Sequence, residues 1–132
     1  MKKNLFAYGT LEVAEVILAI TGKTFDSMPA TLHGYARYLL KDQSYPGIVS
    51  EDGACTRGTL YRGLDLSSIQ KIDNYEDTCY TKELVEVQTI DGEIVKAFAF
   101  VVPESDKSLL SEKCWDKQDF VANQLESFLR YI

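Results

Sequence analysis

Histidine and cysteine are scarce in this sequence, and their scarcity excludes several kinds of active site. The 132 residues include one histidine, His33, and three cysteines, Cys55, Cys79 and Cys114. A single histidine excludes a multi-histidine metal centre and leaves His33 as the only possible base of a catalytic triad. The cysteines are widely spaced and form no C-x-x-C pair, which is typical of reduced thiols in a cytoplasm. We therefore expect a cytoplasmic protein without a metal site.

Basic residues and long apolar runs are also few. Lys and Arg total 14 against 20 Asp and Glu, a formal net charge of -6, which disfavours nucleic acid and anionic membrane surfaces as partners. No stretch approaches the ~18 consecutive apolar residues of a membrane-spanning helix. The sequence also has no extended glycine-rich phosphate loop. We expect no nucleic-acid partner, no membrane partner and no cofactor, while the oligomeric state stays open.

The remaining composition is that of an ordinary globular domain. Hydrophobic residues make up 45% and charged residues 26% of the chain. The chain has the length of one domain, and it contains no linker, internal repeat or low-complexity segment. We therefore expect residues 1–132 to form a single domain.

The first elements are predicted from apolar patterns near the N-terminus. Residues 4–8 form a short apolar run that ends at Gly9, which predicts a strand followed by a turn. Thr10 is a candidate N-cap and Gly22 a candidate C-terminal stop for the helix that follows. One face of that helix is marked by apolar residues at helical spacing: Val13, Val16, Ile17 and Ile20.

Strands dominate the middle of the chain. We predict strands over 30–40 and 56–62, a turn at 51–53, and a helix that is capped by Asp65 and ends near 74–76. Its predicted inner face consists of Leu66, Ile69 and Ile72.

The C-terminal part contains the clearest local signal. The Asp91-Gly92 pair lies between two apolar runs and predicts a β-hairpin with a type I′ turn. A last helix is predicted to start at Asp116, with an inner face of Val121, Leu125, Phe128 and Leu129. Few helices among consecutive strands favour an α+β fold, in which a mixed, mainly antiparallel sheet curls into a compact barrel with flanking helices.

Two segments could carry chemistry. At Tyr8-Gly9-Thr10-Leu11 a strand ends and a helix begins, so backbone N–H groups could hold a carboxylate or an oxyanion. By themselves, the same four residues are more typical of an ordinary turn with a capping threonine. Glu76 follows a helix and lies among aromatic residues, which disfavours the ionised carboxylate and suits a proton shuttle. It could also be a solvated loop residue like its acidic neighbours.

Other chemically capable residues are weaker candidates. His33 lies in a predicted strand, and Cys79 has no adjacent base, so we interpret both as structural. Four tyrosines could line a pocket or simply edge the core: Tyr35, Tyr38, Tyr61 and Tyr75.

The segment from Phe6 to Leu11 resembles the signature that opens the gamma-glutamylcyclotransferase-like, or AIG2-like, superfamily. Further blocks resemble that family in the same order along the chain: Leu32–Tyr35, Tyr45–Val49, Arg57–Tyr61, Asp73–Val87 and Trp115-Asp116. The resemblance implies a compact mixed barrel with flanking helices. It also implies a pocket formed by Tyr8, Gly9, Thr10 and Leu11 together with Glu76.

The activity implied by the resemblance is cyclisation of a γ-glutamyl amide to 5-oxoproline with release of the amine. Glu76 would act as general acid and base, the turn residues would bind substrate, and no cofactor would be needed. A non-catalytic small-molecule-binding protein with the same fold and cavity is the alternative. Lys82 replaces the family's usual arginine, and Phe98 and Phe100 stand in a late strand where many members have a tyrosine.

Overall fold

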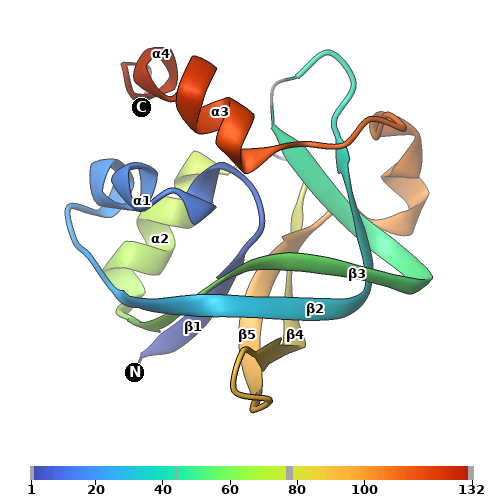
Figure 1. Ribbon diagram of the computed structural model, residues 1–132. Coiled ribbons are helices and arrows are strands. Elements are labelled where there is room, and N and C mark those ends of the chain that lie inside the picture. The colour runs from blue at the N-terminus through green and yellow to red at the C-terminus, as the bar shows by residue number, and fades with distance from the viewer. Residues whose placement is uncertain (1, 44, 77–78, 131–132) are drawn as a thin grey trace.

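Five strands form a closed barrel in the computed structural model, which describes residues 2–43, 45–76 and 79–130 (Figure 1). The barrel order is β1-β3-β2-β4-β5, and β1 closes it by pairing with β5 in parallel, whereas all other pairs are antiparallel. The strands are β1 (Lys3–Ala7), β2 (Asp26–Leu39), β3 (Pro46–Leu64), β4 (Thr81–Thr89) and β5 (Ile94–Val101). This confirms the predicted mixed, mainly antiparallel barrel.

Short helices connect and cover the strands. They are η1 (Thr10–Glu12), α1 (Ala14–Thr21), α2 (Leu66–Tyr75), η2 (Glu104–Leu109), α3 (Lys117–Asn123) and α4 (Leu125–Leu129). In Figure 1, α1 and α2 lie together on one side of the barrel, and α3 and α4 lie above them. No helix within the described residues is long and apolar enough to cross a membrane. That residues 1–132 form one domain stays a prediction.

Strand β1 is buried on both faces over Leu5–Ala7, which explains the apolar sequence of these residues. Phe6 and Tyr8 belong to the cluster of core residues inside the barrel. Leu5 and Ala7 belong to a second cluster, between the barrel and the helices. Successive side chains of a strand point to opposite faces, so a strand between two cores needs apolar residues at every position.

The first helix begins later than the sequence pattern indicates. Thr10 is not its N-cap, because residues 10–12 form the 3₁₀ helix η1, with Glu12 N donating to Gly9 O at 2.9 Å. The N-cap of α1 is Val13, which makes no side-chain capping bond. The predicted stop is confirmed: Gly22 caps α1 in the left-handed region, with φ 75°.

The predicted turn at 51–53 is a bulge within β3 instead. His33 pairs with Cys55 and Tyr35 pairs with Ser50, so four residues of β3 lie opposite Gly34. Both Gly34 and Gly53 have positive φ. A bulge and a turn require the same small, flexible residues, so the local sequence does not separate them.

Helix α2 ends within the predicted range, but its inner face differs in one residue. Ile72 is buried as expected, whereas Leu66 is exposed. Leu66 is the first residue of the helix, directly after Asp65.

The predicted hairpin forms between β4 and β5 with a different turn. Gly92 N donates to Thr89 O at 2.9 Å and Thr89 N donates to Glu93 O at 2.8 Å. Gly92 has a positive φ of 86° but Asp91 does not, so the connection is a three-residue loop rather than type I′.

The last helix is divided at Gln124 into α3 and α4. Asp116 caps α3 as predicted, and its carboxylate accepts a hydrogen bond from Gln118 N at 2.9 Å. Phe120 takes the buried position, while Val121 is exposed and its predicted place on the inner face is wrong.

Candidate functional site

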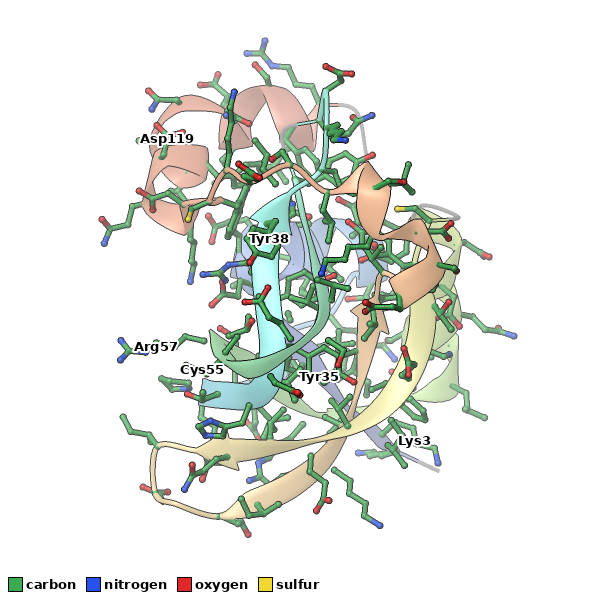
Figure 2. All side chains as sticks on the ribbon, turned by 90° about the vertical axis from the view of Figure 1, so that its right-hand side faces the viewer. Lys3, Tyr35, Tyr38, Cys55, Arg57 and Asp119 are labelled. Carbon is green, nitrogen blue, oxygen red and sulfur yellow. The ribbon has the colours of Figure 1, made fainter. Side chains whose placement is uncertain are left out.

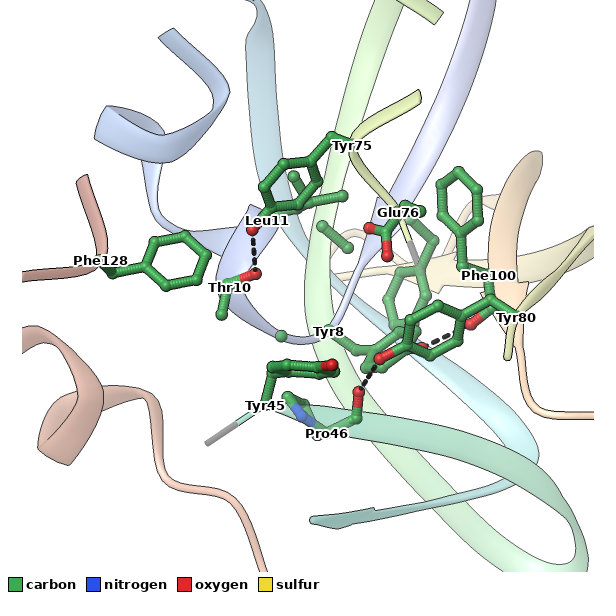
Figure 3. Close-up of a pocket in the computed structure, with 13 residues that line it drawn as sticks. Tyr8, Thr10, Leu11, Tyr45, Pro46, Tyr75, Glu76, Tyr80, Phe100 and Phe128 are labelled. Atoms are coloured by element: carbon green, nitrogen blue, oxygen red, sulfur yellow. Dashed lines mark hydrogen bonds between the residues drawn. The ribbon is translucent and has the colours of Figure 1, made fainter. Parts of the chain in front are cut away.

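A pocket of about 290 Å³ opens at one end of the barrel, and the two sequence candidates line it together (Figure 3). The Tyr8–Leu11 turn forms one part of its wall, and Glu76 reaches it from the end of α2. Phe6 and Ala7 extend the wall directly before the turn, and Tyr75 lies beside Glu76. The rest of the lining is mostly aromatic and comes from four other segments of the chain: Tyr45-Pro46, Tyr80, Phe100 and Phe128. The closed barrel therefore joins residues that are far apart in sequence.

Glu76 occupies the C-cap of α2, where the chain leaves the helix. Its N–H donates to Ile72 O at 3.0 Å, and its own backbone is already extended. The side chain is half-buried and points into the pocket in Figure 3. The amphipathic helix thus fixes the position of the carboxyl group through backbone bonds.

The negative charge of Glu76 affects the pKa values of three tyrosines in the pocket. Burial raises the pKa of Tyr8 well above its usual value, and the negative charge of Glu76 raises it further. Burial also raises the pKa of Tyr80, and raises that of Tyr75 to about 12, again with a contribution from Glu76. All three hydroxyl groups therefore stay protonated and uncharged at neutral pH.

These hydroxyl groups are engaged with the protein. Tyr8 donates to Phe100 O, and Tyr80 donates to Pro46 O at 2.6 Å. The Tyr75 hydroxyl lies 3.3 Å from the Thr10 hydroxyl, in a bond that either group could donate. Each bond joins two different segments of the wall, so the bonds hold the pocket in shape.

The carbonyl groups of the Tyr8–Leu11 turn are held from the other side. Arg37 donates from Nη1 to Tyr8 O at 2.8 Å. The Tyr61 hydroxyl donates to Leu11 O at 2.9 Å. Tyr61 is 3% exposed, and burial raises its pKa, so this donor stays protonated at neutral pH. Both ends of the turn are thus anchored.

Glu12 lies directly behind this turn and does not line the pocket. Its side chain is 11% exposed, accepts a hydrogen bond from Thr59 Oγ1 at 3.2 Å and lies 3.9 Å from Arg37 Nη1. Its negative charge therefore has its own partners and does not compete for a ligand in the pocket.

Gly9 is required by close contact across the pocket rim. A Cβ atom at this position would lie 2.9 Å from Pro46 Cγ and 3.0 Å from Pro46 Cδ. Its φ of -134° is not left-handed, and the contact with Pro46 is what restricts a larger side chain here.

A family model described as gamma-glutamyl cyclotransferase, AIG2-like, matches residues 5–117 of this chain. The chain is 34% identical over 128 residues to Protein AIG2 C of Arabidopsis thaliana, covering 96% of this chain and 76% of that protein. The chain belongs to this AIG2-like family. The resemblance noted in the sequence is thereby confirmed.

Solved structures agree with this assignment. A solution structure of an Arabidopsis thaliana protein superposes with a TM-score of 0.77 at 31% identity, covering 99% of this chain and 79% of that one. A structure named gamma-glutamyl cyclotransferase superposes with a TM-score of 0.65 at 18% identity, covering 77% and 67%. The second likeness shows that the fold is shared.

The departures from the AIG2-like pattern lie mostly outside the pocket. Lys82 makes a 2.9 Å ion pair with Asp73 and lies over the Phe98 ring, 5.4 Å from its centroid. Neither Lys82 nor Phe98 lines the pocket, whereas Phe100 does. The exchange of arginine for Lys82 therefore changes an ion pair outside the pocket.

The pocket of this AIG2-like chain includes residues that sequence patterns alone did not mark as functional. Of the four candidate tyrosines, Tyr75 lines the pocket, and Tyr35, Tyr38 and Tyr61 do not. In the sequence, Tyr45 and Tyr80 were noted only as parts of the family blocks, and Phe128 only as a residue on the inner face of the last helix. The useful signal for all three is an aromatic ring next to a family motif or on the last helix.

The cysteines and His33 take no part in the lining of the pocket. Cys55 lies at the surface near Arg57 (Figure 2), Cys114 is exposed and Cys79 is half-buried. His33 is exposed, and its Nε2 lies 3.2 Å from Gln88 Oε1. Among the described residues, no group of three or more His, Cys, Asp or Glu is arranged to hold a metal.

Proposed function

We propose that this protein is a gamma-glutamyl cyclotransferase-type enzyme, which converts a γ-glutamyl amide into 5-oxoproline and a free amine. The observation that supports this most strongly is the pocket shared by the Glu76 carboxyl group and the Tyr8–Leu11 turn. Membership of the AIG2-like family supports the same reaction. We expect the enzyme to act in the cytoplasm without a cofactor.

The reaction takes place within one substrate molecule. The α-ammonium group loses a proton to Glu76, and the resulting amine attacks the γ-carbonyl carbon and forms the ring C–N bond, while the carbonyl π electrons move to the oxygen. Glu76 passes this proton to the departing nitrogen and then takes the second surplus proton from the ring nitrogen. The carbonyl re-forms, the bond from that carbon to the departing nitrogen breaks, and the second proton leaves with the amine as its ammonium form. The products are 5-oxoproline and the amine, and no water, oxidant or reductant is consumed.

A single carboxyl group suffices because nucleophile and electrophile both belong to the substrate. The protein has to hold the substrate in a folded conformation, so that the amine lies next to the carbonyl, and the aromatic walls of the pocket suit this task. Backbone N–H groups of the Tyr8–Leu11 turn are the proposed partners of the substrate carboxylate or of the developing oxyanion. This division of roles needs neither a serine–histidine nor a cysteine–histidine pair.

The test is to incubate the purified protein with γ-glutamyl amides and to measure 5-oxoproline by mass spectrometry. Glu76→Gln keeps the shape of the side chain and removes the titratable proton, so the rate should fall by at least ~10²-fold, the low end for a general acid and base. Glu104→Gln, at an exposed position outside the pocket, is the matched control and should retain the wild-type rate.

Three outcomes would contradict parts of the proposal. A Glu76→Gln protein that forms 5-oxoproline at the wild-type rate would remove the assigned role of Glu76. Binding of 5-oxoproline without any turnover of γ-glutamyl amides would identify a binding protein instead. An activity lost on chelation and restored by one metal ion would refute the cofactor-free mechanism.

A further inference from the structure

One end of the pocket is walled by three aromatic rings from separate parts of the chain. Tyr45 precedes β3, Tyr75 ends α2 and Phe128 belongs to α4, and we call these three residues the aromatic end. In Figure 3, Phe128 lies across the pocket from Phe100. The rings of the aromatic end are half-buried, whereas Tyr8 is buried. The rings of the aromatic end are therefore more exposed than the ring of Tyr8.

These rings are supported by packing. Phe128 meets Tyr75 edge to face, with centroids 6.2 Å apart and planes at 76°. Phe128 also meets Phe120 edge to face at 5.3 Å, and Phe120 is 1% exposed in the core between barrel and helices. Edge-to-face pairs stabilise aromatic clusters beyond the area that they bury. The surface of the aromatic end is thus preformed for a flat apolar group.

The pocket is poorly equipped to accept an additional carboxylate. Among the described residues that line it, Glu76 alone carries a charged side chain, and that charge is negative. The hydroxyl groups of Tyr8, Tyr75 and Tyr80 already bond to protein groups. A carboxylate on the departing amine would lose water without a cation to replace it, and it would be repelled by Glu76.

We infer that the departing amine of the substrate carries an aromatic substituent and no carboxylate, and that the aromatic end binds this ring. The inference rests on the proposed cyclotransferase function and specifies its substrate class. The γ-glutamyl part, with its own α-carboxylate, is common to all substrates of the reaction, so differences among them report on the amine side alone.

Four γ-glutamyl compounds separate the effect of the ring from that of the carboxylate. The benzylamide has a ring and no second carboxylate, γ-glutamylphenylalanine has both, the methylamide has neither, and γ-glutamylalanine has the carboxylate alone. We expect kcat/KM for 5-oxoproline formation to be at least ~10-fold higher for the benzylamide than for each of the other three, since even one methylene in an apolar pocket changes it by ~10–200-fold.

A variant of the wall tests the location of the ring. Phe128→Ala should lower the ratio of kcat/KM for the benzylamide to kcat/KM for the methylamide by at least ~10-fold. Val121→Ala, an exposed residue of α3 that does not line the pocket, is the matched control and should change neither. Equal losses for both amides on Phe128→Ala would refute the assigned subsite.

The outcomes separate this inference from the proposed function. Turnover with a preference for γ-glutamylalanine, or with no preference, would support the cyclotransferase and overturn the inference. If no compound is consumed, dissociation constants of the wild-type protein for the same four compounds decide the point. Tightest binding of the benzylamide would then support the aromatic subsite while the proposed reaction fails, and equal or absent binding would refute both.

Discussion

The hydroxyl group of Tyr61 offers a precise test of how the Tyr8–Leu11 turn is held. Its oxygen lies 2.9 Å from Leu11 O and 3.0 Å from Glu12 O, and it is the donor to both. Tyr61→Phe removes this donor and retains the ring, whose burial should be unchanged. The substitution therefore isolates one shared hydrogen bond between β3 and the turn.

The expected cost follows from the burial of this site. A net hydrogen bond contributes ~1 kcal/mol, and a buried carbonyl left without its donor costs ~1–3 kcal/mol. Tyr61 is 3% exposed, so water does not readily replace the lost donor. We expect Tyr61→Phe to lower the free energy of unfolding by about 2 kcal/mol. With a denaturant slope of ~2 kcal/mol per molar urea, the midpoint should fall by about 1 M.

Urea denaturation followed by circular dichroism measures this change, and amide hydrogen exchange locates it. Residues 9–12 should exchange faster in Tyr61→Phe, while the β4–β5 hairpin should exchange locally as in the wild type. Tyr35→Phe is the matched control, since the Tyr35 hydroxyl forms no hydrogen bond to another described residue. Equal midpoints for Tyr61→Phe and the wild type would refute the anchoring role.

Three further predictions concern pH, packing and thiols. Burial raises the pKa of Glu12 above its usual 4.5, so the folded state loses stability as the pH rises through this range. Glu12→Gln should therefore have a higher urea midpoint than the wild type at pH 7 and the same midpoint near pH ~3.5. The same difference between the two midpoints at both pH values would contradict this. Gly58→Ala would place Cβ in steric overlap with Ala7 O, so it should lower the free energy of unfolding by ~3 kcal/mol in urea denaturation. A loss under ~1 kcal/mol would be inconsistent with this overlap. Cys55 and Cys114 are exposed, so changing both to Ser should alter neither the urea midpoint nor the rate of 5-oxoproline formation. Loss of activity in a folded variant would show that one of these thiols takes part in the reaction.

The parts of the fold that were predictable from sequence depend on contacts close along the chain. Gly22 ends α1 because a left-handed residue is needed there, and the flanking strands and Gly92 suffice to predict a hairpin. Thr10 shows the opposite case. Its hydroxyl pairs with Tyr75, 65 residues away, and no local pattern reveals that a helix cap would be replaced by a tertiary bond.

The candidate site was predictable in part for a similar reason. Gly9 at the end of an apolar run and Glu76 among aromatic residues are unusual for their surroundings in the sequence, so both were recognised as candidates. The family pattern then placed them in one pocket. Arg37 and Tyr61 were not visible as supports of the turn. Their partners are backbone carbonyl groups, which every residue has, and sequence therefore carries no mark of the contact.

The two ends of the pocket should differ in how freely they can change. At the buried end, Tyr8 packs inside the barrel, bonds to strand β5 through its hydroxyl and bonds to Arg37 through its carbonyl, so a substitution there perturbs binding and folding together. At the aromatic end, Tyr45 and Phe128 are half-buried, so their replacement removes less apolar area from the fold. Under the proposed amine subsite, changes in the size of these two rings therefore alter the preferred amine at the smallest cost to folding stability, while the carboxyl group of Glu76 and its surroundings stay as they are.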